Sequence, residues 1–167
     1  MNLQLLDASL LRSDPEAFRM RLRDARGYLE TLSDLYPSFG TWFAEKVMPG
    51  VAAGERTIVL QNISGVLSGI AVLKDTPDEQ KLCCLRVLPA FQGTGAGVRL
   101  FDKSFDLLNN KAPLLSVSEE QLPAFEKIFR YFGFEYAEAY CGIYRPKKTE
   151  ISFNGLLIPE NNTLACN

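Results

Sequence analysis

One stretch decides the fold of this chain, Leu85-Arg86-Val87-Leu88-Pro89-Ala90-Phe91-Gln92-Gly93-Thr94-Gly95-Ala96-Gly97. Its apolar first part predicts a strand that ends at Pro89, and three alternate glycines then lead into a helix. Glycine permits positive φ and lets a ligand approach the backbone closely. Successive N–H groups in such a loop can converge on one anion, helped by the positive end of the helix. The stretch therefore predicts a loop that binds a pyrophosphate.

Three kinds of phosphate-binding loop fit a strand followed by glycines and a helix. A Walker A loop needs Gly-x-x-x-x-Gly-Lys-Ser/Thr, and the chain has no such string. A dinucleotide fingerprint needs Gly-x-Gly-x-x-Gly and an acidic residue ~20 positions on. Here the glycines stand at 93, 95 and 97, and the neighbourhood of Leu115 is apolar. The third pattern, Gln/Arg-x-x-Gly-x-Gly/Ala, is matched by Gln92-x-x-Gly95-x-Gly97.

Periodicity and turn residues predict the elements on either side of this loop. The predicted helices are Ser13 to Tyr36, Ser38 to Val47 (ended by Pro49-Gly50), about 95–109, and one from Ser118 to Gly133. The predicted strands are Asn2 to Asp7, Thr57 to Gln61, Val66 to Lys74, Gln80 to Leu88, Pro113 to Val117, Phe134 to Tyr144 and Ile151 to Ile158. We expect an α/β (α+β) fold with a mixed sheet and helices on both faces. We expect one domain over residues 1–160, with a frayed tail at 161–167.

Composition excludes several function classes. A net charge of −2 gives no general attraction to nucleic acid or to an anionic membrane. No apolar run approaches the ~20 residues of a membrane span, and the N-terminus shows no secretory signal, so we expect a cytoplasmic protein. The chain has no histidine and no C-x-x-C pair, which argues against zinc and against Ser-His or Cys-His catalysis. Cys83 and Cys84 are neighbours on a predicted strand and are expected to point to opposite faces.

With Val87-Leu88-Pro89 before the loop and Tyr131-Phe132-Gly133-Phe134 further on, the chain resembles the GCN5-related N-acetyltransferase (GNAT) superfamily. The resemblance covers about residues 1–158. It implies a mostly antiparallel sheet of six to seven strands, and an acyltransferase that uses acetyl-coenzyme A as co-substrate without a metal. It also implies which residues bind the coenzyme: strand backbone at Leu85 and Val87 for the pantetheine arm, and backbone amides of Gln92, Gly93, Thr94, Gly95, Ala96 and Gly97 for the pyrophosphate.

The resemblance further implies direct attack of an acceptor amine on the thioester. Such an amine is mostly protonated near neutral pH, so a base must take its proton. Many family members carry a tyrosine four residues before the glycine of Gly-Phe, where this chain has Phe129; Tyr131 is the candidate substitute. The histone-modifying branch has a glutamate where this chain has Lys81. Glu79 shares a strand face with Lys81 and is the candidate base.

Other side chains are candidates for the acceptor side. Glu150 is another carboxylate that could reach the acceptor, although the simpler interpretation is an exposed hairpin charge. An aromatic set falls where family members build the acceptor pocket, and core packing is its simpler interpretation: Tyr36, Phe39, Trp42 and Phe43.

Three functions stay open at this point. The first is N-acetyl transfer to an amine of a small molecule or a protein, and the second is a catalytically silent coenzyme A-binding sensor or interaction module. The third is a toxin-like aminoacyl-tRNA acetyltransferase that would use Arg19, Arg23 and Arg26, although the negative net charge disfavours nucleic acid. Many family members dimerise through their late strands, so the resemblance also implies a homodimer. The sequence does not identify the acceptor.

Overall fold

The structure is a computed structural model that describes residues 2–157. The predicted ends at residues 158 and 160 and the predicted tail at 161–167 lie outside the described residues. The strands are β1 (Asn2–Leu6), β2 (Arg56–Ile63), β3 (Val66–Asp75), β4 (Gln80–Val87), β5 (Leu115–Ser118), β6 (Tyr136–Cys141) and β7 (Thr149–Phe153). The α-helices are α1 (Ala8–Ser13), α2 (Pro15–Glu30), α3 (Phe39–Trp42), α4 (Met48–Ala53), α5 (Ala96–Leu108) and α6 (Leu122–Phe132). Short 3-10 turns cover Thr31–Asp34 and Pro89–Phe91, and a π-helical turn covers Phe43–Val47.

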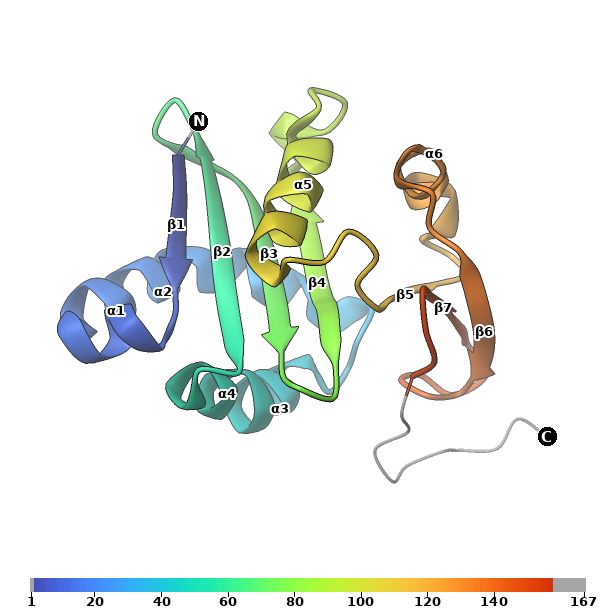
Figure 1. The fold of residues 1–167 in the computed structure, drawn as a ribbon, viewed down its shortest axis with the longest axis horizontal. Coiled ribbons are helices and arrows are strands. Elements are labelled where there is room, and N and C mark those ends of the chain that lie inside the picture. Colours follow the sequence, from blue (N-terminus) through green and yellow to red (C-terminus); the bar gives the residue numbers. More distant parts are fainter. Residues whose placement is uncertain (1, 158–167) are drawn as a thin grey trace.

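The strands form two antiparallel sheets, in the orders β1-β2-β3-β4 and β5-β7-β6. One parallel bridge, between Lys81 and Leu114, joins them. There the Leu82 N–H donates to the Leu114 carbonyl at 2.9 Å, and the Leu114 N–H donates to the Gln80 carbonyl at 3.0 Å. Beyond this bridge β4 and β5 part, as Figure 1 shows. The prediction of six to seven strands is confirmed, and they divide into two sheets because the pairing between β4 and β5 stops after one bridge.

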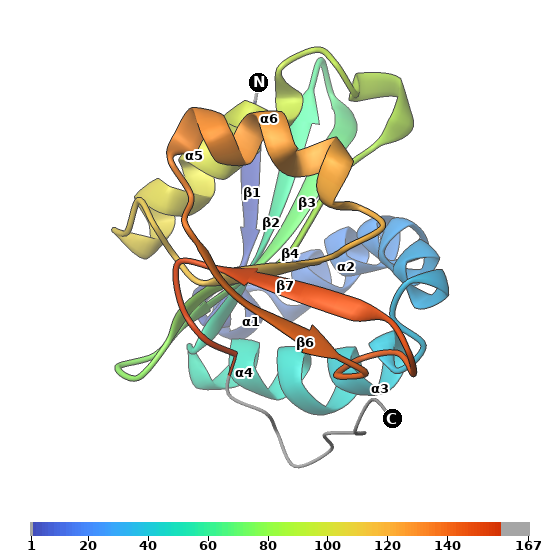
Figure 2. The same cartoon turned by 90° about the vertical axis from the view of Figure 1, so that its right-hand side faces the viewer.

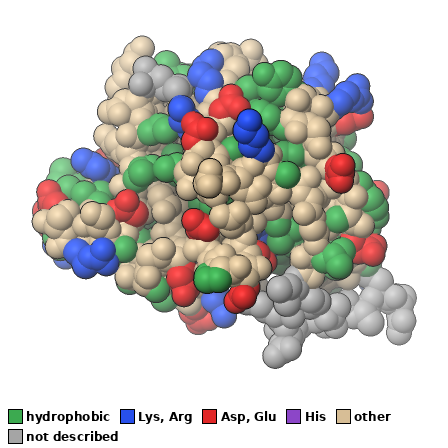
Figure 3. Space-filling view, in the orientation of Figure 1, with side chains coloured by type: hydrophobic (Ala, Val, Ile, Leu, Met, Phe, Trp, Pro, Cys, Tyr) green, Lys and Arg blue, Asp and Glu red, His purple; other side chains and the backbone are tan. Residues whose placement is uncertain are grey.

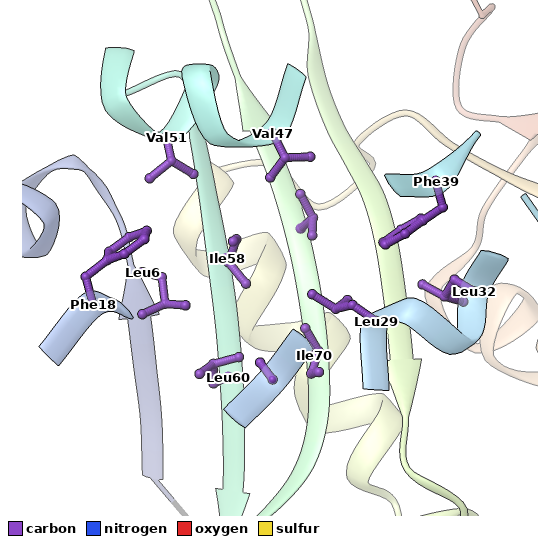
Figure 4. Packing of buried hydrophobic residues seen from close by; sticks show 12 residues of the cluster. Leu6, Phe18, Leu29, Leu32, Phe39, Val47, Val51, Ile58, Leu60 and Ile70 are labelled. Carbon is purple, nitrogen blue, oxygen red and sulfur yellow. The ribbon is translucent and has the colours of Figure 1, made fainter. Parts of the chain in front are cut away.

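Helices cover both faces of the four-stranded sheet. α2, α3 and α4 pack on one face, where Leu6, Ile58 and Ile70 meet Leu29 and Val47 (Figure 4). α5 packs on the opposite face against Val59, Ala71 and Leu73, together with α6 and the apolar face of the second sheet. Two separate cores therefore lie on the two sides of the first sheet, which confirms the predicted helices on both faces.

A β-bulge interrupts β4. Val72 on β3 lies opposite Cys84, and Leu73 lies opposite Leu82, so Cys83 is an extra residue without a counterpart on β3. Both cysteines pack against the core on the α2 side, whereas Leu82 and Leu85 pack on the α5 side. The prediction that Cys83 and Cys84 point to opposite faces is therefore wrong, because an inserted residue breaks the two-residue alternation of a strand.

The predicted helix from Ser13 to Tyr36 is the helix α2 followed by a 3-10 turn, and the short helix α1 before it was not predicted. Asp7 caps α1 by accepting from the Leu10 N–H at 2.9 Å, and Asp14 caps α2 by accepting from the Ala17 N–H at 2.9 Å. The helix predicted to end at Pro49-Gly50 instead continues to Ala53. A proline clashes with the carbonyl four residues before it. The wider π-helical turn just before α4 relieves that clash, so Pro49 sits in the first turn of α4.

The final hairpin is shorter than predicted, with strands Tyr136–Cys141 and Thr149–Phe153. The β7 strand alternates, with Glu150 and Ser152 on one face and Ile151 and Phe153 on the other. Glu150 is thus part of a strand and not of the turn, so its side chain has a fixed direction on one face of the second sheet.

The described residues contain no helix that has the length and apolar character needed to cross a membrane. Figure 3 shows acidic and basic side chains interspersed over the visible face, without an extended patch of one sign. This distribution agrees with the small net charge of −2.

Phe101→Ala tests how far the aromatic core holds α5, α6 and the second sheet together. Phe101 is 1% exposed, and its ring lies 5.7 to 6.3 Å from those of Phe105, Phe129, Phe132 and Phe134. Loss of this ring should lower the free energy of unfolding by about 3–5 kcal/mol. Leu107→Ala, on the exposed side of the same helix, is the control and should cost less than about 1 kcal/mol. Denaturant unfolding measures both, and equal losses would contradict this packing.

Candidate functional site

The glycine-rich loop adopts a backbone that only glycine takes up easily. Gly93 has φ 74° and Gly95 has φ 79°, both in the left-handed region. The N-cap of α5 is Gly95, and no side chain caps this helix. By contrast, Asp7 and Asp14 cap the first two helices. The start of α5 therefore has no protein group to satisfy its first N–H donors.

Several backbone N–H groups of this loop and of the first turn of α5 have no hydrogen-bond acceptor in the described part of the chain. Among residues 2–157, no hydrogen bond is found for the backbone N–H of Gly93, Gly95, Ala96, Gly97 and Val98. The first backbone bond of the helix is donated by the Arg99 N–H to the Gly95 carbonyl at 3.2 Å. Unpaired N–H groups at a helix N-terminus bind anions well, because the helix dipole adds positive potential there. The loop can thus hold an anion such as a pyrophosphate.

The end of β4 presents its backbone beside this loop. The Leu88 N–H donates to the Ser68 carbonyl at 2.9 Å, so by alternation the peptide groups of Val87 and Leu85 face the other edge. The Val87 carbonyl accepts instead from Gln92 Nε2 at 3.3 Å. A Cβ on Gly97 would lie 3.4 Å from Val87 Cγ2, which places the start of α5 against the end of β4. The structure thus brings these sequence-predicted residues together.

The two predicted catalytic residues lie far apart. Glu79 is in the turn between β3 and β4, where its carboxylate accepts from Lys74 Nζ at 2.8 Å. Tyr131 is on α6, 72% exposed, with its ring edge against Phe132 at 4.9 Å. Figures 1 and 2 show the β3–β4 turn and α6 at opposite ends of the molecule. Glu79 and Tyr131 are therefore not one catalytic pair in this structure.

Phe129 occupies the place where many relatives of the predicted family carry tyrosine. It is 4% exposed, and its ring lies 4.7 Å from Phe153 and 5.3 Å from Phe134. A tyrosine hydroxyl in this apolar cluster would need a polar partner. The phenylalanine therefore serves core packing and joins α6 to the second sheet.

The site contains a carboxylate whose burial the sequence did not reveal. Glu150 is 4% exposed, so its interpretation as an exposed hairpin charge is wrong. The Tyr36 hydroxyl donates to Glu150 Oε1 at 3.5 Å, and Ser116 is a further hydrogen-bond partner. The Tyr36 ring packs edge-on against Tyr144 at 5.7 Å. These four residues and Lys81 make a polar cluster, here called the Glu150 cluster, between the second sheet and the chain after α2.

Burial dominates the electrostatics of the Glu150 cluster. Loss of water raises the pKa of Glu150, while hydrogen bonds from Ser116 and Tyr36 and the charge of Lys81 oppose that rise. Burial and the nearby Glu150 raise the pKa of Tyr36. The pKa of Tyr144 is raised chiefly by burial. A carboxyl group with a raised pKa is a better proton acceptor near neutral pH than an ordinary one.

Strand alternation in the sequence could have indicated part of this cluster. Glu150 and Ser152 alternate with Ile151 and Phe153, which predicts a shared polar face. Pairing with β5 places Glu150 beside Ser118. The periodicity does not show that Tyr36 covers this face. The aromatic residues divide likewise, with Phe39 buried, Trp42 and Phe43 half-buried against the core, and Tyr36 in the site.

The remaining candidates have simple explanations. Arg19, Arg23 and Arg26 are exposed, and each pairs with an acidic residue of its own helix, Glu16, Asp24 and Glu30 respectively. Cys83 and Cys84 are free thiols, and burial raises the pKa of Cys84 to about 12. Within residues 2–157 there is no cluster of three or more potential metal ligands.

Glu150→Gln should change how stability depends on pH. The folded-state pKa of Glu150 lies above its ordinary value of 4.5, so the folded state holds its proton to higher pH than the unfolded state. This contribution to stability is full below pH 4.5 and is lost as pH rises through the folded-state pKa. The wild type should therefore lose stability relative to Glu150→Gln as pH rises above 4.5, measured by denaturant unfolding.

Glu120→Gln is a control for which the change of stability with pH should have the opposite sign. Hydrogen bonds from Lys148 and Arg145 hold the pKa of Glu120 below 4.5. That contribution is present above pH 4.5 and is lost as pH falls through the folded-state pKa. The wild type should gain stability relative to Glu120→Gln with rising pH, and slopes of the same sign for both variants would contradict the assignment.

Comparison with known proteins places this geometry in a known fold. No family model matches the chain, and no curated protein matches its sequence. A spermidine N-acetyltransferase chimera from Vibrio cholerae and hSSAT is 17% identical and aligns over 92% of this chain and 95% of its own, with a TM-score of 0.57. A Desulfovibrio desulfuricans protein described as a GNAT-family acetyltransferase is 17% identical, over 91% of this chain and 97% of its own, with a TM-score of 0.54.

A third structure was solved with a bound ligand. A GNAT-family acetyltransferase from Elizabethkingia anophelis with acetyl-CoA bound is 13% identical, over 66% of this chain and 82% of its own, with a TM-score of 0.52. The chain also matches a nourseothricin acetyltransferase but spans only 62% of that chain's length. The parted strands and the glycine loop at the start of α5 agree with the three alignments that have TM-scores of 0.52 to 0.57. The chain has the GNAT fold.

Proposed function

We propose that this chain is an acetyl-CoA-dependent N-acetyltransferase that transfers acetyl directly to an amine. The observation that carries the proposal is the set of unpaired amides at Gly93 and at residues 95–98, placed beside the open edge of β4. An aligned structure of the same fold was solved with acetyl-CoA. The expectation of a cytoplasmic protein is kept with this proposal, because that compartment supplies acetyl-CoA.

The residues present fit acetyl-CoA. Gly93 and Gly95 have positive φ, and a Cβ at Gly93 would meet open space, so the loop stays accessible to a bulky phosphate ligand. The unpaired amides of Gly93, Gly95, Ala96 and Gly97 would hold the pyrophosphate, and the edge peptides of Leu85 and Val87 would pair with the pantetheine amides. The predicted amides of Gln92 and Thr94 instead donate within the loop, to the Pro89 and Phe91 carbonyls at 3.2 and 3.4 Å. When bound, acetyl-CoA supplies the acetyl group as a thioester.

The bulge in β4 supplies a donor for the thioester carbonyl. Cys83 has no paired residue on β3, and a bulge leaves such a residue outside the hydrogen-bond ladder. Cys83 directly follows Leu82, the residue at which the pairing between β4 and β5 ends. A backbone N–H at this point would polarise the carbonyl and stabilise negative charge on its oxygen.

Glu150 is the base that the geometry supports best. It is buried and hydrogen-bonded, and its pKa is raised. An acceptor amine with a pKa of ~10 must lose a proton before or during attack. Glu150 would take that proton while the amine nitrogen bonds to the acetyl carbon and the carbon–sulfur bond breaks. The sequence predicted Glu79 as the base and Tyr131 as the substitute for the family's tyrosine. Both are kept as alternatives and are tested beside Glu150.

A second function rests on a specific observation. Phe129 is buried in the core and Tyr131 is exposed, so neither residue offers a proton to a leaving thiolate from inside the site. This favours a coenzyme A-binding module without turnover. A thiolate with a pKa of ~8.5 can leave without a donor, however, so the enzyme remains the preferred proposal.

Gly95→Ala tests whether the backbone amides of the glycine-rich loop bind the pyrophosphate of coenzyme A. A Cβ at φ 79° strains the backbone by about 1–2 kcal/mol, so the loop should rearrange and the affinity for coenzyme A should fall about tenfold or more. Gly54→Ala is the matched control, because Gly54 has φ 80° at the end of α4, away from the loop. Titration calorimetry measures both variants. Undiminished affinity in Gly95→Ala would count against the pyrophosphate site.

Glu150→Gln tests the base. Glutamine is nearly isosteric but does not accept the proton, so kcat should fall on the order of 10²-fold or more, with coenzyme A affinity unchanged. Thiol release from acetyl-CoA with an amine panel measures the rate. Glu79→Gln and Tyr131→Phe are compared in parallel and should retain most activity. A large loss in Glu79→Gln with none in Glu150→Gln would move the role to Glu79.

A further inference from the structure

Two half-buried cations act on Cys83, and neither forms an ion pair with a carboxylate among residues 2–157. They are Arg56 at the start of β2 and Lys81 near the start of β4. Neighbouring cations are paired, since Lys74 contacts Glu79 at 2.8 Å. A charge taken partly out of water raises the free energy unless an anion joins it. These two side chains are therefore suited to bind an anion from solution.

Both cations act on the same point of the bulge. Arg56 Nη1 donates to Cys83 Sγ at 3.2 Å. Burial is the largest cause and raises the pKa of Cys83, while the charges of Lys81 and Arg56 oppose that rise and the charge of Glu79 adds a smaller contribution to it. The thiol therefore stays neutral and does not act as their counter-ion. A thiol is also a weak hydrogen-bond acceptor, so it leaves most of the guanidinium's donors unused.

The Arg56 side chain is held in place before any ligand arrives. A Cβ on Gly50 would lie 2.7 Å from Arg56 Cδ, so only glycine leaves room for this stem. The guanidinium carbon lies 5.9 Å from the centroid of the Trp42 ring. A fixed guanidinium binds a carboxylate through two parallel hydrogen bonds and loses little conformational entropy in doing so.

Lys81 connects this anion site to the proposed base. Its charge acts on Cys83 and also on Tyr144 and Glu150. Arg56 therefore lies at Cys83 at one end and the buried carboxylate of Glu150 at the other, and the charge of Lys81 acts on both. One small ligand that carries a carboxylate and an amine would match both ends.

We propose that the acetyl acceptor is an amine that also carries a carboxylate, of the amino-acid class. Arg56 and Lys81 bind its carboxylate, and its amine faces Glu150. The inference rests on the proposed transferase function. The amine nitrogen forms a bond to the acetyl carbon and the carbon–sulfur bond breaks. Glu150 takes the proton, coenzyme A leaves as the thiolate, and the acceptor's carboxylate is unchanged.

Matched acceptor pairs test this proposal in the full chain. Glycine, β-alanine and 4-aminobutyrate are each compared with the corresponding amide, which keeps the size and removes the negative charge. Aminomethylphosphonate and spermidine complete the panel as a second anion and a polycation. We expect kcat/KM for at least one amino acid to exceed that of its amide about tenfold or more, since each tenfold step is 1.4 kcal/mol. The preferred number of carbon atoms between the amine and the carboxylate of the acceptor reports the distance between the two cations and Glu150.

Two variants connect this preference to the cations. Lys81→Met and Arg56→Met keep the apolar stems and remove the charges, and each should reduce the acid-to-amide ratio of kcat/KM about tenfold. Lys111→Met removes an exposed charge in the loop before β5 and should leave the ratio unchanged. If Arg56→Met does not fold, Lys81→Met still tests the proposal. A ratio that stays at the wild-type value in folded Lys81→Met would overturn it.

The other outcomes separate this inference from the proposed function. Amides or spermidine acetylated as well as the acids would overturn the inference and leave the transferase intact. A preference for the phosphonate over every carboxylate would also overturn it. Binding of acetyl-CoA by calorimetry without transfer to any acceptor would overturn both the inference and the enzyme proposal. No binding of acetyl-CoA would remove the cofactor site itself.

Discussion

The inserted residue Cys83 in β4 is the constraint on which the rest of the structure depends. Before Cys83, the peptide group of Leu82 faces β5, away from β3. After Cys83, the peptide group of Val87 also faces away from β3. In a regular strand, residues that face the same edge are an even number of positions apart, but Leu82 and Val87 are separated by an odd number. Only an extra residue makes that change of alternation compatible with continued pairing to β3. The same insertion turns Cys83 and Cys84 to one side and Leu85 to the other. It therefore sets both the open strand edge and the side of the sheet to which Cys83 and Cys84 turn.

Side-chain packing, rather than backbone pairing, holds the second sheet in place. The two sheets share only the Lys81–Leu114 bridge. Phe101 and Phe105 of α5 meet Phe129 and Phe132 of α6, and Phe153 of β7 closes the cluster against Phe129. Aromatic burial of this kind is strong but places no demand on the peptide groups of β4. The strands can therefore part where a ligand would bind, while the fold stays intact.

Polar groups gather on the opposite face of the second sheet, and their burial has a cost. Glu150 is hydrogen-bonded to Tyr36 and Ser116, whereas Ser118 Oγ is buried without a hydrogen-bond partner in the described part of the chain. A buried carboxylate would be replaced readily by an apolar residue if it served stability alone. Its burial with these partners and its raised pKa are consistent with the proposed role as a base.

The sequence by itself determined what depends on neighbours along the chain. It located the glycine loop of residues 92–97, the helix that follows, and the alternation that leads to seven strands, because turn chemistry and periodicity are local. It did not show that Cys83 is an extra residue, that Glu79 is engaged by Lys74, or that Tyr36 covers Glu150. Those facts depend on register between strands and on contacts between residues as far apart as 36 and 150. Only the tertiary structure decides such contacts, because burial and pairing across the chain leave no mark on a local pattern.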